Sequence, residues 1–375
     1  MSAIPTSAST ARRAGAAHNR YLIGPAADVL LLGGASLVVL PIVALLWPEG
    51  SNTATLAAVM AIIAHVVNHP HFAHSYQLFY SNFKKRAFGN ALPPKLRARY
   101  LFAGVLAPSL LLAYFTYCVL TKNANLLGLS ANLMFFLVGW HYVKQGYGML
   151  MVDAVLKRNF FDDKGKIKLQ ANAYSVWMTS WLLINRALGE HNYWGLDYVA
   201  IKIPDALFVV SICVTVGTSI AVLPVLAARL RGSSRLTAGA VAYVSSLYLW
   251  LLTSNPALWL VIPAFHSIQY LVVVWRYRLN QEKLHDPASR RFFRSRPTWV
   301  SLASFAVTGL VLGYIGFWHV PSWLDTHTGI DQSLFGGALF MFLCWIFINI
   351  HHYLLDNVMW RKDNPDTKRY LFGDS

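Results

Sequence analysis

Long runs of apolar residues alternate with short polar connections along almost the whole chain. Ten of these runs reach or approach the roughly 20 residues that a helix needs to cross a bilayer. They cover 27–47, 54–79, 100–120, 126–152, 172–189, 205–228, 237–254, 257–276, 299–320 and 334–359. A backbone within a membrane must satisfy its own hydrogen bonds, so we expect these runs to be helices. The pattern predicts an all-α, polytopic transmembrane bundle of about ten spans.

The connections are too short to form a separate soluble domain. We therefore expect one transmembrane domain over residues 27–360, between an N-terminal arm (1–26) and a C-terminal tail (361–375). The arm is rich in Ala and Ser and contains three Arg but no acidic residue. Such a composition is compatible with an organellar transit peptide. A cytoplasmic arm is the simpler interpretation.

The distribution of positive charge predicts the orientation of the bundle. If the N-terminus lies in the cytoplasm, the cytoplasmic segments are the arm, 80–99, 153–171, 229–236, 276–298 and the tail. These segments hold every Lys and Arg except Lys122, Arg186 and Lys202 in outer connections and Lys144 within a span. Because Lys and Arg accumulate in cytoplasmic loops, both termini are expected to be cytoplasmic. We expect an integral, multi-pass protein of a bacterial inner membrane.

Composition supports the membrane assignment and excludes other classes. The chain of 375 residues is 56% hydrophobic and only 13% charged, with a mean hydropathy of +0.43. The net charge of +16 is explained by basic cytoplasmic loops next to anionic lipid, so we expect no nucleic-acid partner. Cys118, Cys213 and Cys344 lie in apolar runs without CxxC spacing. This spacing argues against disulfides, zinc ribbons and covalently attached haem.

Histidines provide the candidate chemistry. Eight of the 13 histidines lie within predicted spans, all in the half nearer the cytoplasm: His65, His69, His71, His74, His141, His266, His351 and His352. Ionisable residues in a membrane are costly and usually mark a functional site. A single histidine of this kind is often structural, but eight from four spans in one layer indicate a buried metal centre. We therefore predict all eight as metal ligands.

The second span holds the densest group, in the segment HVVNHPHFAHSYQ. His65 and His69 are four residues apart, and His71 and His74 are three apart, so each pair shares a helix face. Pro70 lies between the pairs. It removes a backbone hydrogen bond and kinks the helix, which we expect to turn both pairs toward one centre.

Polar residues one helical turn from the other histidines are expected to support the centre. Gln145 follows His141 by four residues, and Gln269 follows His266 by three. Metal-bound imidazoles need a partner on the other ring nitrogen, so Gln145 or Asp153 could supply one. Asp356 follows His352 by four residues and could hold an imidazole or bind the metal. We predict Asp356, Gln145 and Gln269 as catalytic residues.

The ligand set indicates the metal and the chemistry. Many imidazoles, few carboxylates and no thiolates suit iron, copper or zinc and not magnesium or calcium. Eight histidines suffice for two metals, and a single metal would leave some for other roles. Motifs for nucleotide binding or a serine nucleophile are absent. Aromatic residues are abundant, with 13 Trp, 18 Tyr and 21 Phe, which favours a lipophilic substrate that enters from the bilayer, together with O₂.

These histidines resemble those of the membrane-bound non-haem iron oxygenases, which include fatty-acid desaturases, lipid hydroxylases and alkane monooxygenases. Those families carry about eight histidines in HxxxH and HxxHH boxes that bind two irons. His65 and His69 match HxxxH, and His351 and His352 match the end of HxxHH without its leading histidine. His71, His74, His141 and His266 fit no box. The bacterial membrane carotene-cleaving dioxygenases, which hold one iron with a few membrane histidines, are similar in design.

The resemblance implies an oxidoreductase with one or two irons, iron being favoured over zinc or copper. It would hydroxylate, desaturate or cleave a lipophilic substrate with O₂, as a monooxygenase of lipid metabolism would. The chain contains no flavin or ferredoxin motif, so a separate electron donor would dock on the basic cytoplasmic face. Two alternatives stay open: a transporter of metal or protons, and a redox carrier with b-type haem between His141 and His266.

Overall fold

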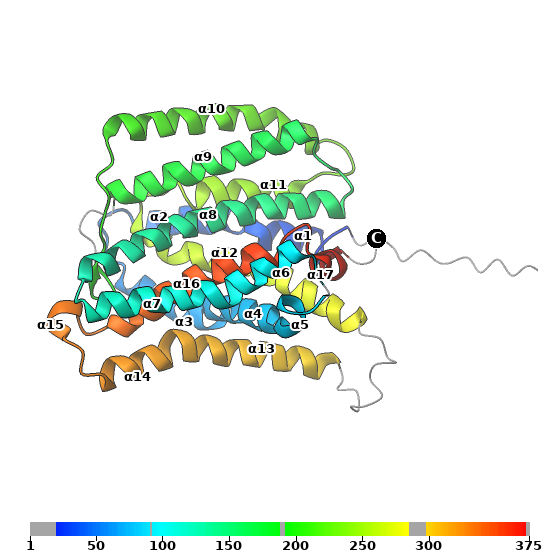
Figure 1. The fold of residues 1–375 in the computed structure, drawn as a ribbon. Coiled ribbons are helices and arrows are strands. Elements are labelled where there is room, and N and C mark those ends of the chain that lie inside the picture. Colours follow the sequence, from blue (N-terminus) through cyan, green and yellow to red (C-terminus); the bar gives the residue numbers. More distant parts are fainter. Residues whose placement is uncertain (1–19, 91, 188–191, 285–297, 373–375) are drawn as a thin grey trace, which may run out of the picture.

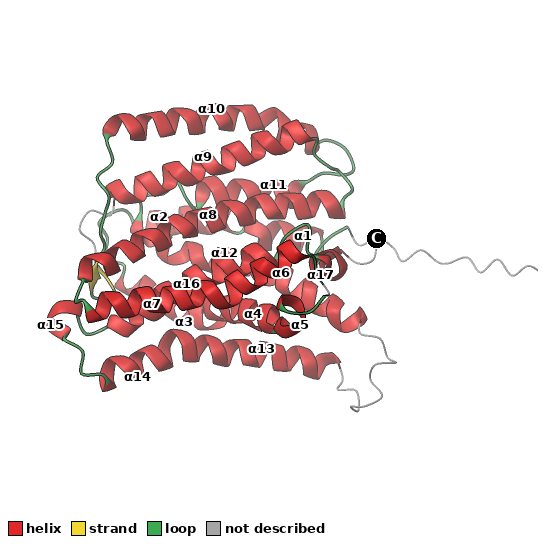
Figure 2. Ribbon diagram, in the orientation of Figure 1, coloured by secondary structure: helices red, strands yellow, loops and turns green. Residues whose placement is uncertain are grey.

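Long helices that lie roughly parallel to one another make up nearly all of the structure (Figures 1 and 2). The computed structural model describes residues 20–90, 92–187, 192–284 and 298–372. Within these ranges, the two β-strands are two residues long each. The prediction of an all-α fold is therefore confirmed.

The N-terminal half contains short helices, long helices and π-helical turns (η) in alternation. They are α1 (Pro25–Val29), η1 (Leu30–Gly34), α2 (Ser36–Leu46), α3 (Ala54–Val66), α4 (Asn68–Tyr80), α5 (Phe83–Ala87), α6 (Pro94–Leu101), η2 (Phe102–Leu106), α7 (Ala107–Leu120), α8 (Ala124–Leu156) and α9 (Asp163–Ala187). A hairpin of β1 (Asn192–Tyr193) and β2 (Leu196–Asp197) follows, with Tyr193 paired to Leu196.

The C-terminal half continues the same architecture. Its elements are α10 (Asp205–Arg229), α11 (Thr237–Val244), η3 (Ser245–Leu249), α12 (Pro256–Leu284), α13 (Thr298–Tyr314), η5 (Ile315–His319), α14 (Val320–His327), α15 (Gln332–Phe335), α16 (Leu339–Met359), α17 (Pro365–Thr367) and η6 (Lys368–Phe372).

Eight helical segments in the described chain are long and apolar enough to cross a membrane, and the chain is accordingly an integral membrane protein. They match eight of the ten predicted spans. The other two, 172–189 and 237–254, correspond to α9 and to α11 with η3. The α11–η3 segment is shorter than the others, and α9 begins in the polar segment DKGKIK. Ten spans and the side on which the termini lie stay predictions.

Three of the candidate spans form the centre of the bundle. In α8, α12 and α16, 56%, 61% and 61% of the most apolar stretch is buried, against 11% in α10 and 22% in the span formed by α13, η5 and α14. In Figure 1, α9 and α10 lie on one side of this centre, and α13 and α14 lie on the other. A side chain on α8, α12 or α16 is therefore well placed to be shielded from both lipid and water.

The second predicted span is broken between its first two histidines. Helix α3 ends at Val66 and α4 begins at Asn68, with Val67 between them at φ −116° and ψ −55°. In an unbroken helix, the ring of Pro70 would clash with the carbonyl of Val66, four residues earlier, and Pro70 has no N–H to donate. The break thus precedes Pro70 by three residues, and His65 lies on a different helix from His69, His71 and His74.

The first span is broken in another way. Gly33, in η1, has a φ of +140°, a conformation that a residue with a side chain rarely adopts. A Cβ atom at Gly33 would lie 3.0 Å from Cβ of Ser245 in η3, so glycine also permits the close approach of these two segments. The approach brings the carbonyl of Leu32 within 2.6 Å of Gln269 Nε2 on α12.

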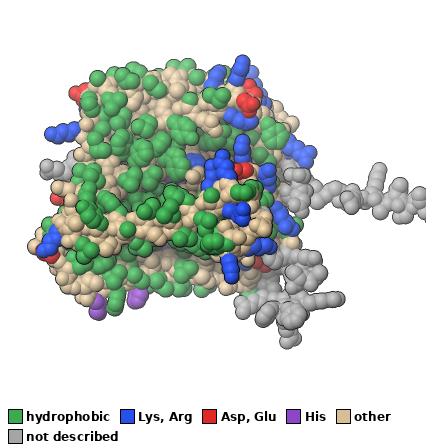
Figure 3. Space-filling model, viewed as in Figure 1, with side chains coloured by type: hydrophobic (Ala, Val, Ile, Leu, Met, Phe, Trp, Pro, Cys, Tyr) green, Lys and Arg blue, Asp and Glu red, His purple; other side chains and the backbone are tan. Residues whose placement is uncertain are grey.

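Lys and Arg side chains gather at one end of the bundle, at the right of Figure 3, where α5, α6, α17 and the C-terminal segment also lie. A buried ion pair lies near this end. Asp153 and Lys157, at the end of α8, form a 2.7 Å salt bridge, and Asp153 Oδ2 also accepts a hydrogen bond from the backbone N–H of Gly239. This contact joins α8 to α11.

Replacing Asp153 with Ala should destabilise the fold by about 3–5 kcal/mol, because the Lys157 ammonium would be left buried without a counter-charge. The measurement is thermal unfolding of the purified protein in detergent. The double change Asp153→Leu with Lys157→Met removes both charges and should recover most of the lost stability. A double variant as unstable as Asp153→Ala would contradict this account.

Candidate metal centre

Four helices contribute one histidine each to a single cluster in the interior. These are His71 on α4, His141 on α8, His266 on α12 and His352 on α16. The exposed fraction is 1% for His71, 5% for His141, 3% for His266 and 0% for His352. The sequence brings them together because α8, α12 and α16 are the most buried helices and α4 packs against both α12 and α16.

Three of these imidazoles are arranged as a metal site requires. His71, His141 and His352 each offer one ring nitrogen, and these nitrogens lie within 4.8 Å of one another. The ring centroids of His71 and His352 are 4.5 Å apart, and those of His141 and His352 are 5.0 Å apart. Three converging imidazoles are a common ligand set for zinc, copper or iron.

His266 and Asp356 complete the cluster. The ring of His266 lies 4.9 Å from that of His141 and 5.1 Å from that of His71. Asp356 Oδ2 lies 3.4 Å from Nε2 of His352 and 3.9 Å from Nε2 of His141. The ligand atoms of His71, His141 and His352 therefore lie close together, with Asp356 Oδ2 beside two of these histidines and the ring of His266 against His71 and His141.

Several polar atoms of the cluster have no hydrogen-bond partner among the described residues. They are Nε2 of His71, Nε2 of His141, both ring nitrogens of His266 and of His352, and Oδ2 of Asp356. A buried polar atom without a partner is costly, and such atoms are rare in native proteins. A cation that takes nitrogen and oxygen ligands would satisfy one nitrogen each of His71, His141 and His352, with Oδ2 of Asp356 beside it.

Hydrogen bonds hold His71 and Asp356 in position from outside the cluster. Nδ1 of His71 lies 3.1 Å from Ser267 Oγ, which leaves Nε2 directed to the centre. Oδ1 of Asp356 accepts hydrogen bonds from Tyr270 at 2.8 Å and from Ser75 at 3.2 Å. Outer contacts of this kind fix the orientation of metal ligands and affect metal affinity.

Aromatic rings shield the cluster on several sides. Tyr142 stacks on His266 with ring centroids 4.1 Å apart, and Tyr353 stacks on His141 at 4.6 Å. The ring of Phe72 lies 4.7 Å from that of His352. These contacts keep water away and fix the planes of the imidazoles.

Gln145 and Gln269 lie beside the cluster. They were expected to bond to imidazole nitrogens, but they form hydrogen bonds with other groups. Gln145 Nε2 donates to the backbone carbonyl of His266 at 3.1 Å and to Gln269 Oε1 at 2.7 Å. Gln269 Nε2 donates to the carbonyl of Leu32. The two amides thus join α8, α12 and η1 behind His266. Asp153, the other predicted partner of His141, is in the ion pair with Lys157 instead.

The other four predicted ligands lie outside the cluster. His65 and His69 pair with each other, with ring centroids 5.0 Å apart. His74 bonds to Gln77 at 2.7 Å and stacks on Phe305. Both ring nitrogens of His351 are in hydrogen-bonding contact, with Tyr76 and with the carbonyl of Ala103, at 2.9 Å each. His74 and His351 have the contacts expected of structural histidines.

Ser75 and Ser267, which form hydrogen bonds to the cluster, and Tyr76, which bonds to His351 beside it, had no part in the sequence prediction. A weak signal was present, because Ser75 lies four residues after His71, and Ser267 is adjacent to His266. Neither spacing is distinctive, since Ser is common in membrane helices and often bonds to its own backbone. Tyr76 contacts His351 only because α4 and α16 pack together.

Comparison of the chain with protein-family models, with curated proteins and with solved structures gives no match. The arguments for function therefore depend on the geometry of this cluster.

Replacing His352 with Gln should lower the affinity for a divalent metal at least 10- to 100-fold, because a ligand is lost from a buried site. The change His74→Gln is the matched control and should leave metal affinity nearly unchanged, since His74 bonds to Gln77 and stacks on Phe305 outside the cluster. Metal content after equilibrium dialysis of the detergent-purified variants measures both. An equal loss of metal affinity in the two variants would contradict the assignment of His352 as a ligand.

Asp356→Asn tests the carboxylate separately. Asparagine keeps the shape but removes the negative charge beside His352 and His141, so metal affinity should fall about 10- to 100-fold. Tyr270→Phe removes one hydrogen bond to Asp356 Oδ1 and should have a smaller effect. Titration with Co²⁺, followed by its optical absorption, would rank the unmodified protein and the two variants by metal affinity. If Tyr270→Phe lowered metal affinity more than Asp356→Asn does, the assignment of Asp356 beside the metal would be overturned.

Proposed function

We propose that this protein is an integral membrane metalloenzyme that holds one iron with His71, His141, His266 and His352, assisted by Asp356. The iron would supply O₂ activation and the oxidation of a C–H or C=C bond in a lipophilic substrate. The unpartnered nitrogens that converge within 4.8 Å are the observation that carries this proposal.

A single metal is favoured over two. The second group of imidazoles, His65 and His69, is separated from the cluster by the rings of Phe317 and Phe72. Phe317 stacks on His69 at 4.6 Å and lies 5.1 Å from Phe72, which in turn contacts His352. No carboxylate of the described chain forms an ion pair with either histidine of this pair. The one-iron design of the membrane carotene-cleaving dioxygenases is therefore a better guide than the two-iron histidine boxes.

The residues around the cluster suit an oxidation in an apolar setting. Tyr142, Tyr353 and Phe72 exclude water, which would otherwise react with or quench oxidising species. Asp356 is the acid–base group closest to the imidazoles and can hold or release a proton near Oδ2. Tyr270 and Ser75 keep Oδ1 fixed, so that Oδ2 is the oxygen available to the centre.

Hydroxylation or desaturation would need two electrons from a separate protein, whereas cleavage of a C=C bond by O₂ would need none. Most of the Lys and Arg side chains seen in Figure 3 gather at one end of the bundle. Trp360, which follows α16, donates a hydrogen bond to Tyr270 at 3.3 Å. An acidic electron donor would be attracted to this basic end.

The two alternatives that the sequence left open, a redox carrier with b-type haem and a transporter, fit the geometry less well than a metal centre does. A haem between His141 and His266 needs room for its ring, but the two imidazoles are only 4.9 Å apart and at 71° to each other, with His71 and His352 beside them. A transporter needs a polar route to both faces. The aromatic shield around the cluster does not favour such a route.

The deciding experiment is elemental analysis together with an optical spectrum of detergent-purified protein. We expect one iron per chain, no Soret band, and O₂ consumption that depends on added lipid extract and a reductant. Preparations of His141→Ala should lack both the iron and the O₂ consumption. Full activity in iron-free protein, or a Soret band, would refute the proposal.

A further inference from the structure

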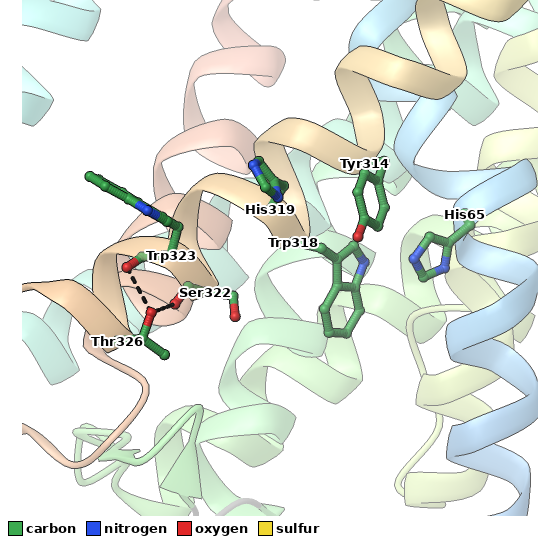
Figure 4. A pocket seen from close by; sticks show the side chains of 7 residues that line it. All are labelled: His65, Tyr314, Trp318, His319, Ser322, Trp323 and Thr326. Atoms are coloured by element: carbon green, nitrogen blue, oxygen red, sulfur yellow. Dashed lines mark hydrogen bonds between the residues drawn. The ribbon is translucent and has the colours of Figure 1, made fainter.

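One series of ring contacts leads from the histidine cluster to a pocket on the surface. It passes from His352 through Phe72 and Phe317 to His69 and then His65. Figure 4 shows the pocket, which His65 lines. The benzene ring of phenylalanine is hard to oxidise, so Phe72 and Phe317 interrupt this series for the passage of single electrons.

A second series, the Tyr–Trp series, leads from the cluster toward the basic end of the bundle. The ring centroid of Tyr270, on α12, lies 4.5 Å from that of His71. Trp360 lies 5.9 Å from Tyr270, Tyr277 lies 5.6 Å from Trp360, and Tyr370, in η6, lies 5.1 Å from Tyr277. All four distances are those of rings in direct contact, about 4.5–7 Å. Beyond the cluster, the series contains tyrosine and tryptophan and no phenylalanine.

The Tyr–Trp series runs inward and not around the bundle. Tyr270 and Tyr277 are only 2% and 6% exposed, whereas Trp360 and Tyr370 are half-buried. Tyrosine and tryptophan are common at membrane interfaces, where they form a belt at the level of the lipid headgroups. Such a belt does not explain buried rings that lead from one end of the bundle to its centre.

The outer end of the series lies in η6, which packs against α12. The backbone carbonyl of Tyr370 accepts a hydrogen bond from Nδ2 of Asn280 at 2.8 Å. Lys368 and Arg369, which precede Tyr370, are exposed. They follow α17, at the end of the bundle where Lys and Arg side chains gather (Figures 1 and 3). An acidic protein would therefore be attracted to the surface beside Tyr370.

The hydrogen bonds of Tyr270 suit the loss of one electron. Among aromatic side chains, phenol and indole lose a single electron most readily, and a phenol does so easily only when an acceptor takes its proton. The hydroxyl of Tyr270 donates to Oδ1 of Asp356 at 2.8 Å. The same hydroxyl accepts a hydrogen bond from Nε1 of Trp360 at 3.3 Å. Tyr270 thus has a proton acceptor on one side and an oxidisable neighbour on the other.

We propose that Tyr270, Trp360, Tyr277 and Tyr370 conduct single electrons from the basic end of the bundle to the histidine cluster. This inference rests on the proposed function, because O₂ chemistry that fails to oxidise a substrate leaves an oxidising equivalent beside the histidine ligands. The series delivers the electron that removes it. The reductant is an acidic one-electron carrier protein that docks beside Tyr370.

Each transfer is balanced in electrons and protons. Tyr270 gives an electron to the oxidised centre and its phenolic proton to Asp356, and it recovers the electron from Trp360 and the proton from Asp356. Trp360 keeps its N–H and is reduced by Tyr277. Tyr277 and Trp360 line a cavity of about 10 Å³, room for about one water, which takes and returns the proton of Tyr277. Tyr370 reduces Tyr277, exchanges its proton with solvent and is reduced by the carrier, so one electron passes inward and no proton is consumed.

The test is flash photolysis of the full-length, metal-free protein in detergent. A ruthenium tris-bipyridine label is attached at position 368 through Lys368→Cys, with Cys213→Ser and Cys344→Ser to remove native thiols that are not buried. A flash in the presence of an electron-accepting quencher oxidises the label, which then withdraws an electron from the chain. With Tyr270→difluorotyrosine, we expect an EPR signal with fluorine splitting, which assigns the radical to position 270.

Variants separate electron transfer from packing. Trp360→Phe keeps an aromatic ring but should abolish most of the radical at position 270, and Trp360→Tyr should restore much of it, because phenol is oxidisable. A merely structural role would give the same result for both changes. Tyr277→Phe should also reduce the radical yield. Tyr76→Phe is the matched control and should keep it, since the ring of Tyr76 contacts His351 and lies outside the series.

Two outcomes would overturn the inference: no radical at position 270 in the labelled protein with Trp360 and Tyr277 intact, and an equal radical yield in Trp360→Phe. Iron is measured separately, on protein that has not been stripped of metal. A radical at position 270 in a protein that binds no iron would count against the proposed oxygenase alone. Bound iron without this radical would count against the Tyr–Trp series alone.

Discussion

The interior of this bundle contains imidazole nitrogen atoms that have no hydrogen-bond partner among the described residues, and the rest of the site is arranged around them. An unpartnered imidazole nitrogen in an apolar region is destabilising. Here, one ring nitrogen each of His71, His141 and His352 lies within 4.8 Å of the other two, with Oδ2 of Asp356 beside His141 and His352. A shared cation would turn this cost into a stabilising interaction, so the stability of the packed core and the occupancy of the centre would be linked.

The fold meets this constraint by placing the most buried helices at the centre. Helices α8, α12 and α16 carry three of the four imidazoles, and α4 supplies the fourth after the chain breaks at Val67. The glycine at position 33 lets η1 approach η3, and the carbonyl of Leu32 then reaches Gln269 behind His266. Distant segments thus hold the cluster rigidly, although only a few residues belong to it.

Sequence reasoning predicted the helical class and the membrane location, because these depend on residue type and on the length of apolar runs. It did not separate the four clustered histidines from the other four. His351 and His352 are adjacent, and only the packing of α16 against α4 and η2 decides which one faces the centre. His65 and His69 share a face on an unbroken helix, but the break at Val67 and the packing of Phe317 placed them apart from His71. Gln145 was found by its spacing from His141, yet its partner is the carbonyl of His266, which no local pattern encodes.

The two contacts of His351 have a consequence for how the centre is loaded. Tyr76 on α4 and the carbonyl of Ala103 in η2 bind the two nitrogens of His351, and these contacts fix the rotation of α16 about its own axis. The direction of His352, about 100° around the helix, is fixed with it and does not depend on a metal. Binding of the proposed metal would therefore not be needed to set the direction of His352. Under the proposal of a metal centre, a chain depleted of the ion would regain it without refolding, so supply of the ion to the membrane would set the fraction of loaded molecules.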